Sequence, residues 1–229
     1  TYDFVKNNLD VCHGHYHGTA VLSCIAGIYE AEGRSDTLGL ATGAEFLLAR
    51  TEKAQIEVFS EEENWLAAVE WSDRNGADII NSSLGYTGNR YFYRDMNGLN
   101  TLVSRAGNLA AKKGILVVNS AGNDGSGGWN FVGAPADADS VLAVGGLLPS
   151  SGIHTAFSSV GPTYDFRQKP NVTAYGHVIA AKKDNVSETQ GTSFSSPLTA
   201  GFAACAWQAN RSWTNMELFH ELEKGSDLY

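Results

Sequence analysis

Three short segments carry side chains that could act together in nucleophilic catalysis. His17 stands before Gly18 where a helical pattern begins, Ser193 stands before a helical run, and Asn123 follows a strand-like run that turns into a glycine-rich loop. A serine at a helix N-terminus can act as a nucleophile, because the helix dipole and free N–H groups stabilise a developing oxyanion. A histidine can accept the serine proton. The carboxamide of Asn123 could supply a second oxyanion donor.

Each of these residues also has a purely structural interpretation. His17 could be a packed histidine beside a glycine, Gly18, that lets another backbone come close. Ser193 could be a helix N-cap, with Pro197 in the first turn where its missing N–H costs nothing. Asn123 could be an ordinary turn residue.

A metal site is a further alternative around the same histidine. In an extended segment His13, His15 and His17 would share one face, with Cys12 nearby, and three imidazoles could bind zinc. A helix that begins at His17 would break this face.

The elements that must position these side chains alternate between helical and β-branched runs. A helix is predicted from Asn64 to Arg74, after a capping box of Ser60 and Glu63 that leaves the three glutamates at 61–63 without a functional role. Another is predicted at about 99–113. Short apolar strands are predicted at 78–85, 115–118 and 141–144, the last closed by two glycines. The alternation indicates an α/β fold with a parallel sheet, and small polar residues follow the strands at the edge where ligands bind in such sheets.

Composition excludes several classes of protein. The 229 residues fit one large domain, and 43% hydrophobic with 18% charged residues excludes a disordered chain. A net charge of −9 without a basic stripe argues against nucleic-acid binding. Three cysteines cannot form a disulfide framework. The uncharged stretch from Thr189 to Asn210 contains a proline and many polar residues, so it predicts a buried helix and no membrane span.

Taken together and in order, the three segments resemble the subtilisin-like serine protease family, the subtilases. The histidine motif of that family corresponds to His-Gly-Thr-Ala-Val at 17–21, its Ala-Gly-Asn motif to 121–123, and its serine motif to Gly-Thr-Ser-Phe-Ser-Ser-Pro at 191–197. Further matches lie at 83–85, 132–136, 157–161 and 169–176, so the resemblance covers nearly the whole chain. Ala20, Phe194 and Ser195 depart from the family pattern in ways that alter packing more than chemistry.

The resemblance implies a three-layer αβα fold with a mostly parallel central sheet and a serine endopeptidase that acts on proteins or peptides. Ser193 would be the nucleophile, His17 the general base and acid, and Asn123 the oxyanion donor. The substrate-binding residues would be Ser83, Leu84, Gly85, Ser120, Ala121, Gly122 and Gly133. No cofactor enters this chemistry and no metal ligand is assigned. The family often carries structural calcium, but the segment from Ile28 to Leu40 shows no calcium-loop pattern. A secreted or extracytoplasmic location is expected.

One departure concerns the triad carboxylate. The family carries its aspartate in an Asp-Ser/Thr-Gly sequence upstream of the histidine, and no such sequence precedes His17. Asp3 and Asp10 are the only carboxylates there, and both are close to His17 in sequence. We therefore expect residues 1–229 to form a single catalytic domain that is incomplete at its N-terminus, with a separate upstream segment supplying the aspartate. The alternatives are a catalytically inactive binding module of the same fold and the metal site at Cys12, His13, His15 and His17.

Overall fold

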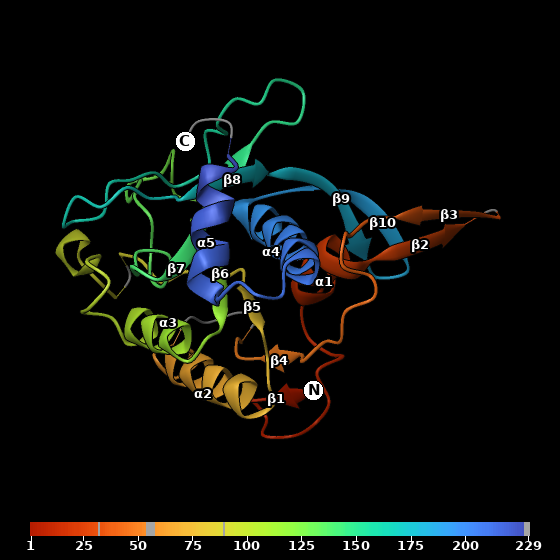
Figure 1. Ribbon diagram of the computed structural model, residues 1–229, viewed down its shortest axis with the longest axis horizontal. Coiled ribbons are helices and arrows are strands. Elements are labelled where there is room, and N and C mark those ends of the chain that lie inside the picture. Colours follow the sequence, from red (N-terminus) through yellow and green to blue (C-terminus); the bar gives the residue numbers. More distant parts are fainter. Residues whose placement is uncertain (32, 54–57, 89, 227–229) are drawn as a thin grey trace.

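A parallel four-stranded sheet forms the centre of the computed structural model (Figure 1), which describes all residues except 32, 54–57, 89 and 227–229. Its strands lie side by side in chain order. They are β5 (Ile79–Ser82), β6 (Leu116–Ser120), β7 (Val141–Leu147) and β8 (Val172–Tyr175). The strand predictions are confirmed in position, but β7 continues through Gly145 and Gly146 instead of ending before them. Every strand of this sheet therefore points its carboxyl end in the same direction.

Helices cover both faces of this sheet, as expected of three layers. On one face lie α2 (Ser60–Arg74) and α3 (Leu102–Lys112), and on the other α4 (Thr192–Ala209) and α5 (Asn215–Lys224). The alternation of side chains along β6 explains the arrangement, since Val117 packs toward α2 and α3 while Leu116 and Val118 pack toward α4 and α5. The two apolar cores formed in this way hold the three layers together.

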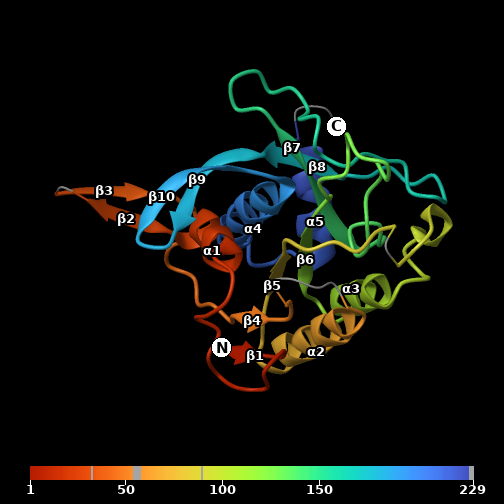
Figure 2. The ribbon, with the colours of Figure 1, turned by 180° about the vertical axis from the view of Figure 1, so that it is seen from behind.

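Smaller elements surround the sheet. Strand β1 (Tyr2–Asp3) pairs in parallel with β4 (Ala49–Arg50), separately from the central sheet. Strands β2 (Ile28–Ala31) and β3 (Arg34–Thr37) form an antiparallel hairpin that projects from the body of the molecule, as Figures 1 and 2 show. Strands β9 (His177–Lys182) and β10 (Asn185–Gln190) form another. Helix α1 (His17–Ala26) packs against α4, and a short 3-10 helix, η1, spans Tyr93–Asp95.

The predicted capping box at the start of α2 is wrong. The helix begins at Ser60, and the hydroxyl of Ser60 does not cap it. Glu61 and Glu62 are fully buried, and Glu61 instead accepts hydrogen bonds from the backbone N–H groups of Lys53 and Val58 at 2.9 and 3.0 Å. These two glutamates therefore have a structural task that the sequence pattern did not show.

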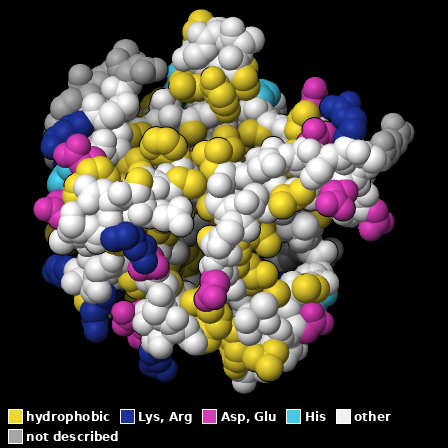
Figure 3. Space-filling view, turned by 45° about the vertical axis from the view of Figure 1, so that its right-hand side comes forward, with side chains coloured by type: hydrophobic (Ala, Val, Ile, Leu, Met, Phe, Trp, Pro, Cys, Tyr) yellow, Lys and Arg dark blue, Asp and Glu magenta, His cyan; other side chains and the backbone are white. Residues whose placement is uncertain are grey.

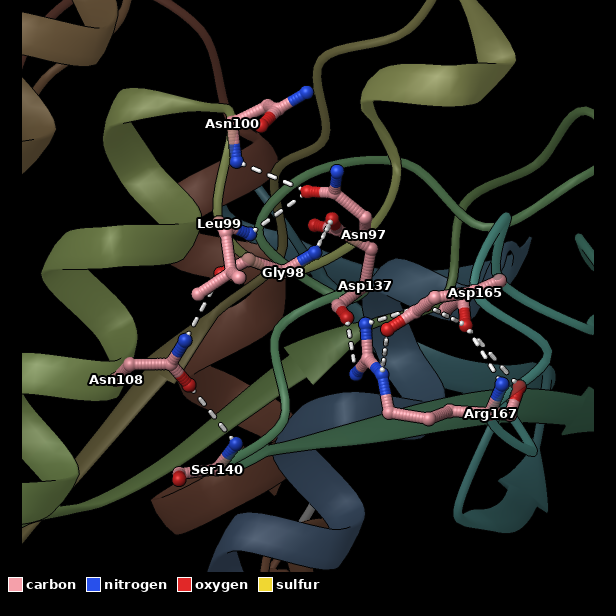
Figure 4. Close-up of polar contacts among 10 residues, drawn as sticks. Asn97, Gly98, Leu99, Asn100, Asn108, Asp137, Ser140, Asp165 and Arg167 are labelled. Atoms are coloured by element: carbon pink, nitrogen blue, oxygen red, sulfur yellow. Dashed lines mark hydrogen bonds and ion pairs between the residues drawn. The ribbon is translucent and has the colours of Figure 1, made fainter.

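Helix α3 begins later than the sequence predicted. Its N-cap is Thr101, whose hydroxyl accepts a hydrogen bond from Ser104 N at 3.1 Å. The preceding turn, residues 97–100, is fixed by Asp137, which accepts a hydrogen bond from Gly98 N at 2.7 Å, while Arg167 donates to the Asp137 carbonyl at 2.8 Å (Figure 4). These hydrogen bonds therefore fix the end of the β5–α3 connection, just before α3 begins.

One side of the molecule exposes large apolar side chains. Figure 3 shows hydrophobic side chains gathered there around a hollow. Several large apolar residues of the described chain are more than half exposed, among them Ile28, Leu40, Ile179 and Phe202.

Among the described residues no helix is long and apolar enough to cross a bilayer.

Candidate active site

The first turns of α1 and α4 bring together the two residues predicted to transfer a proton. His17 is the first residue of α1 and Ser193 is the second of α4, and the two helices pack against each other. The ring of Phe194, which follows Ser193, meets the His17 imidazole edge to face with centroids 6.1 Å apart. The helix start predicted at His17 is therefore confirmed, and residues 176 positions apart in sequence lie in one neighbourhood.

Backbone geometry sets the start of α4. Gly191 precedes the helix with φ of 140°, a conformation that residues with a side chain rarely adopt. The helix begins at Thr192, so Ser193 lies inside its first turn, and the alternative of Ser193 as an N-cap is wrong. Pro197 is the sixth helical residue and not part of the first turn. The Ser193 N–H therefore belongs to the set of helix N-terminal donors that lack an intrahelical acceptor.

The end of β5 fixes the position of Ser193. The Ser83 hydroxyl donates to the Ser193 carbonyl at 2.8 Å, and the Ser193 hydroxyl lies 3.4 Å from the Ser83 carbonyl. One turn further along α4, the Ser196 hydroxyl donates to Asn81 Oδ1 at 2.8 Å. These bonds attach the first turns of α4 to the carboxyl edge of the sheet.

Asn123 is held in one orientation by the residue before Ser193. Its Oδ1 accepts hydrogen bonds from the backbone N–H of Thr192 at 2.9 Å and from the Thr192 hydroxyl at 3.0 Å. A backbone N–H can only donate, so the atom that faces it must be the amide oxygen. The Nδ2 donor is left for another acceptor, and Asn123 is solvent-exposed, so a substrate can reach it. Sequence analysis had not identified Thr192 as the anchor of this group.

The imidazole of His17 is largely buried next to a second histidine. Burial lowers the pKa of His17 from its ordinary value, and the nearby His15 lowers it further. The His15 ring also accepts a hydrogen bond from His17 N at 3.2 Å. Neutral imidazole, the form that accepts a proton, is therefore favoured at His17.

Both upstream carboxylates are engaged away from His17. Asp3 is fully buried, with Arg50 Nη1 at 2.9 Å and His13 Nε2 at 3.0 Å from its Oδ2. Burial would raise the pKa of Asp3, but hydrogen bonds from Lys6 N, Arg50 and Val5 N outweigh it and lower the pKa. The exposed Asp10 accepts a hydrogen bond from Cys12 N at 2.9 Å. Within the described part of the chain, no carboxylate forms an ion pair with His17.

The chain before α1 does not form the face that a zinc site would need. Residues 11–16 bend instead of running as a strand, and His13 turns toward Asp3. No group of three or more histidine, cysteine or acidic side chains among the described residues is arranged to hold a metal ion. The structure therefore does not support the metal alternative at Cys12, His13, His15 and His17.

A cleft next to Ser193 gathers the predicted substrate-binding residues. It has a volume of about 280 Å³. All seven predicted residues line it: Ser83, Leu84, Gly85, Ser120, Ala121, Gly122 and Gly133. Asn123, Asp124, Thr87 and Ser193 complete the lining. Sequence analysis missed Thr87, whose place in the cleft depends on a turn that no motif marks.

Asp124 brings a carboxyl group to this cleft. Burial raises the pKa of Asp124 from its ordinary value. Among the residues that the structure describes, no cationic side chain pairs with it, so a cationic substrate side chain could do so.

Comparison with known proteins adds evidence that is independent of this geometry. The family model described as "Subtilase family" matches residues 2–225. The chain is 31% identical over 224 residues to "Subtilisin" of Bacillus pumilus, covering 94% of this chain and 74% of that protein. It is 33% identical over 213 residues to "Subtilisin NAT" of Bacillus subtilis subsp. natto, covering 92% of this chain and 50% of that protein. The chain therefore spans about half the length of this relative.

Solved structures agree with the sequence comparisons. A "cold adapted subtilisin-like serine proteinase" superposes with a TM-score of 0.76 at 25% identity, covering 97% of this chain and 72% of that chain. The three-layer fold described above is thus the fold of subtilisin-like proteins.

Proposed function

Because the chain belongs to the subtilase family, we propose that it provides the nucleophile, base and oxyanion donors of a serine endopeptidase. In this proposal Ser193 attacks the peptide carbonyl while His17 takes its proton and later returns it to the leaving amine. Asn123 Nδ2 and the Ser193 N–H bind the oxyanion. The observation that carries the proposal is the bond from Thr192 N to Asn123 Oδ1, which leaves an amide donor free beside a helix-terminal serine.

The carboxylate that would orient His17 is proposed to come from a polypeptide segment outside residues 1–229. Helix α2 joins strands β4 and β5, a connection typical of neighbouring parallel strands. These two strands nevertheless form no hydrogen bonds with each other, and among the described strands β5 pairs only with β6. A further parallel strand between β4 and β5 would satisfy both edges, and its carboxyl end would lie at the same side of the sheet as Ser83 and Ser193.

Space beside Gly18 supports the same proposal. The sequence suggested that this glycine admits a close backbone, but no described atom outside its chain neighbours and the backbone of α1 lies within 4 Å of where its Cβ would stand. A segment carrying Asp, a small residue and Gly could occupy this side of α1.

Intact-mass analysis of folded, active protein should show extra N-terminal mass or a second bound peptide. The mass of residues 1–229 alone, in fully active protein, would contradict this source of the carboxylate.

The cleft supports a preference for substrates with a large apolar P1 side chain. Gly85, whose missing Cβ would meet no described atom within 4 Å outside its own chain neighbours, leaves room in the cleft for Phe, Tyr, Leu or Met, and Asp124 would add tolerance for Lys. The backbone at 83–85 would pair with an extended substrate, so unfolded chains and flexible loops should be cleaved faster than folded domains. Equal rates for a native protein and its denatured form would contradict this substrate geometry.

Inhibition separates the proposed protease from the other candidate functions. Hydrolysis of a peptide with P1 Phe should be abolished by a serine-directed fluorophosphonate and unaffected by a chelator. Loss of activity with the chelator would indicate a metal-dependent hydrolase, or a structural calcium ion for which no site is assigned. Peptide binding without hydrolysis would indicate the inactive binding module. A secreted or extracytoplasmic location stays a prediction.

A further inference from the structure

The turn that follows β5 places a threonine against the base of the cleft. Tyr86 pairs with Ala134 through two backbone hydrogen bonds, from Tyr86 N at 2.9 Å and from Ala134 N at 3.1 Å. This pairing brings the next residue, Thr87, beside Gly133. A Cβ built on Gly133 would lie only 2.7 Å from Thr87 Cγ2. The Thr87 methyl group therefore occupies the space that the glycine at the base leaves open.

From this geometry we infer that Thr87 limits the depth of the P1 cleft, and that Arg90 and Tyr91 are positioning residues that hold Thr87 there. The inference rests on the proposed function, since it specifies which P1 side chains the cleft admits. With Gly133 alone at its base the cleft would be deep. The methyl group of Thr87, which lies in front of Gly133, makes the cleft shallower by about the length of one methyl group.

The turn is fixed first through its own backbone. The carbonyl of Thr87 accepts hydrogen bonds from Arg90 N at 3.0 Å and from Tyr91 N at 3.1 Å. The position of Thr87 thus depends on where the side chains of Arg90 and Tyr91 are anchored.

Both anchors end on the buried carboxylates at the start of α2. Arg90 Nη1 donates to Glu62 Oε1 at 2.9 Å, and Arg90 Nη2 lies 3.4 Å from Glu61 Oε2. The Tyr91 hydroxyl donates to the other oxygen of Glu62 at 2.6 Å. Charge-assisted hydrogen bonds to a fully buried carboxylate are strong and directional, so they hold the turn in one geometry.

Contacts of the Tyr86 side chain hold the start of the turn. The Tyr86 hydroxyl donates to Glu52 Oε1 at 2.7 Å, and the Arg90 guanidinium lies over the Tyr86 ring at 5.0 Å. The wall of the cleft is therefore attached to the segment that precedes α2 as well as to the helix itself, which is what a rigid specificity element requires.

The test measures binding and hydrolysis of peptides that differ only at P1, with Leu, Phe or Trp. Thr87→Ala should improve kcat/KM for Trp relative to Leu about tenfold, because one methyl-sized space is worth about 10–200-fold in an apolar pocket. Thr87→Val, which keeps the volume, should retain the wild-type ratio. Thr37→Ala on the exposed hairpin strand β3 is the matched control for the substitution itself.

The positioning role has its own readout. Tyr91→Phe and Arg90→Lys should raise KM more than they lower kcat and should reduce discrimination between P1 residues. Arg90→Lys, which keeps the charge, should stay closer to wild type than Arg90→Met. A lower melting temperature with an unchanged P1 profile would show that Arg90 and Tyr91 are structural only and would overturn this role.

Failure of the proposed function can be recognised separately. Binding of product peptides ending in Leu, Phe or Trp is measured with Ser193→Ala protein, which needs no hydrolysis. In one outcome the wild-type protein hydrolyses no peptide, while Thr87→Ala in the Ser193→Ala background still tightens binding of the Trp peptide. In that case the endopeptidase proposal fails and the inference about Thr87 stands. If Thr87→Ala and Thr87→Val both keep the wild-type P1 profile, or no peptide shows P1-dependent binding, the inference is overturned.

Discussion

Replacing Asn123 should separate two tasks that its carboxamide performs with different atoms. Asn123 Nδ2 is the proposed oxyanion donor, while Oδ1 accepts from the backbone N–H of the fully buried Thr192. Asn123→Ala removes both atoms. Asn123→Asp keeps an acceptor for Thr192 but removes the donor and places negative charge where the oxyanion would form.

The magnitudes follow from these roles. Loss of one oxyanion donor lowers kcat by about 10²–10³, a value measured in a subtilisin, with little change in KM because the bond forms in the transition state. Leaving the buried Thr192 N–H without an acceptor costs about 1–3 kcal/mol of the free energy of unfolding. For a chain of this size that corresponds to a fall in Tm of about 2–12 °C. Asn123→Asp should lose at least as much kcat but less of the Tm.

Steady-state hydrolysis of a chromogenic peptide and thermal unfolding of the same samples measure the two effects. Thr37→Ala serves as a surface control for handling and folding. A fall in kcat of less than about tenfold for both Asn123 variants would refute the oxyanion assignment. An unchanged Tm for Asn123→Ala would refute the anchoring role of the Thr192 bond.

Three further predictions concern titrating groups. Burial raises the pKa of Asp124, so hydrolysis after P1 Lys relative to P1 Phe should increase as pH rises through that pKa, and Asp124→Asn should remove the dependence. Burial and His15 lower the pKa of His17 below 6.5, so an NMR titration of residues 1–229 should give a midpoint below that value, and binding of the carboxylate segment should raise it. A midpoint that stays constant would contradict the pairing. Burial lowers the pKa of Lys169 from 10.5 to about 7, so between these two values the unfolded chain binds more protons than the folded chain. The free energy of unfolding should therefore rise from about pH 7 to about pH 10.5, and chemical denaturation of Lys169→Met should lack this slope.

Local sequence patterns predicted the layers and the order of the elements well. Runs such as 115–118 are apolar throughout, which is typical of a strand buried on both faces, and β6 is buried along its whole length. The helix start at His17 also followed from local periodicity. These features depend on neighbours in sequence, and a pattern within a short window can indicate them.

The errors arose where distant residues decide the structure. Ser60 and Glu63 had the spacing of a capping box, but Arg90, which is 28 residues from Glu62 in sequence, pairs with the glutamates of this segment. Extended geometry would have aligned His13 with His17, but the buried Asp3 turns His13 away. Nothing in a local window shows which partner a buried charge will find.

The candidate site shows the same division. Motifs identified His17, Asn123 and Ser193, since each stands at the end or start of a predictable element. Thr192 and Thr87 were missed as functional residues, because their roles depend on contacts with Asn123 and Gly133 from other parts of the chain. Folding brings these pairs together only through the crossover connections of the sheet.

The nucleophile is the central claim, and covalent labelling tests it most directly. Folded protein is treated with a fluorophosphonate, digested and mapped by mass spectrometry, with Ser193→Ala protein treated in parallel. The label should lie on Ser193 in the wild-type protein and be absent from the variant. A label on Ser83, Ser120 or Ser196, or labelling that persists in Ser193→Ala, would contradict the assignment of Ser193 as the nucleophile.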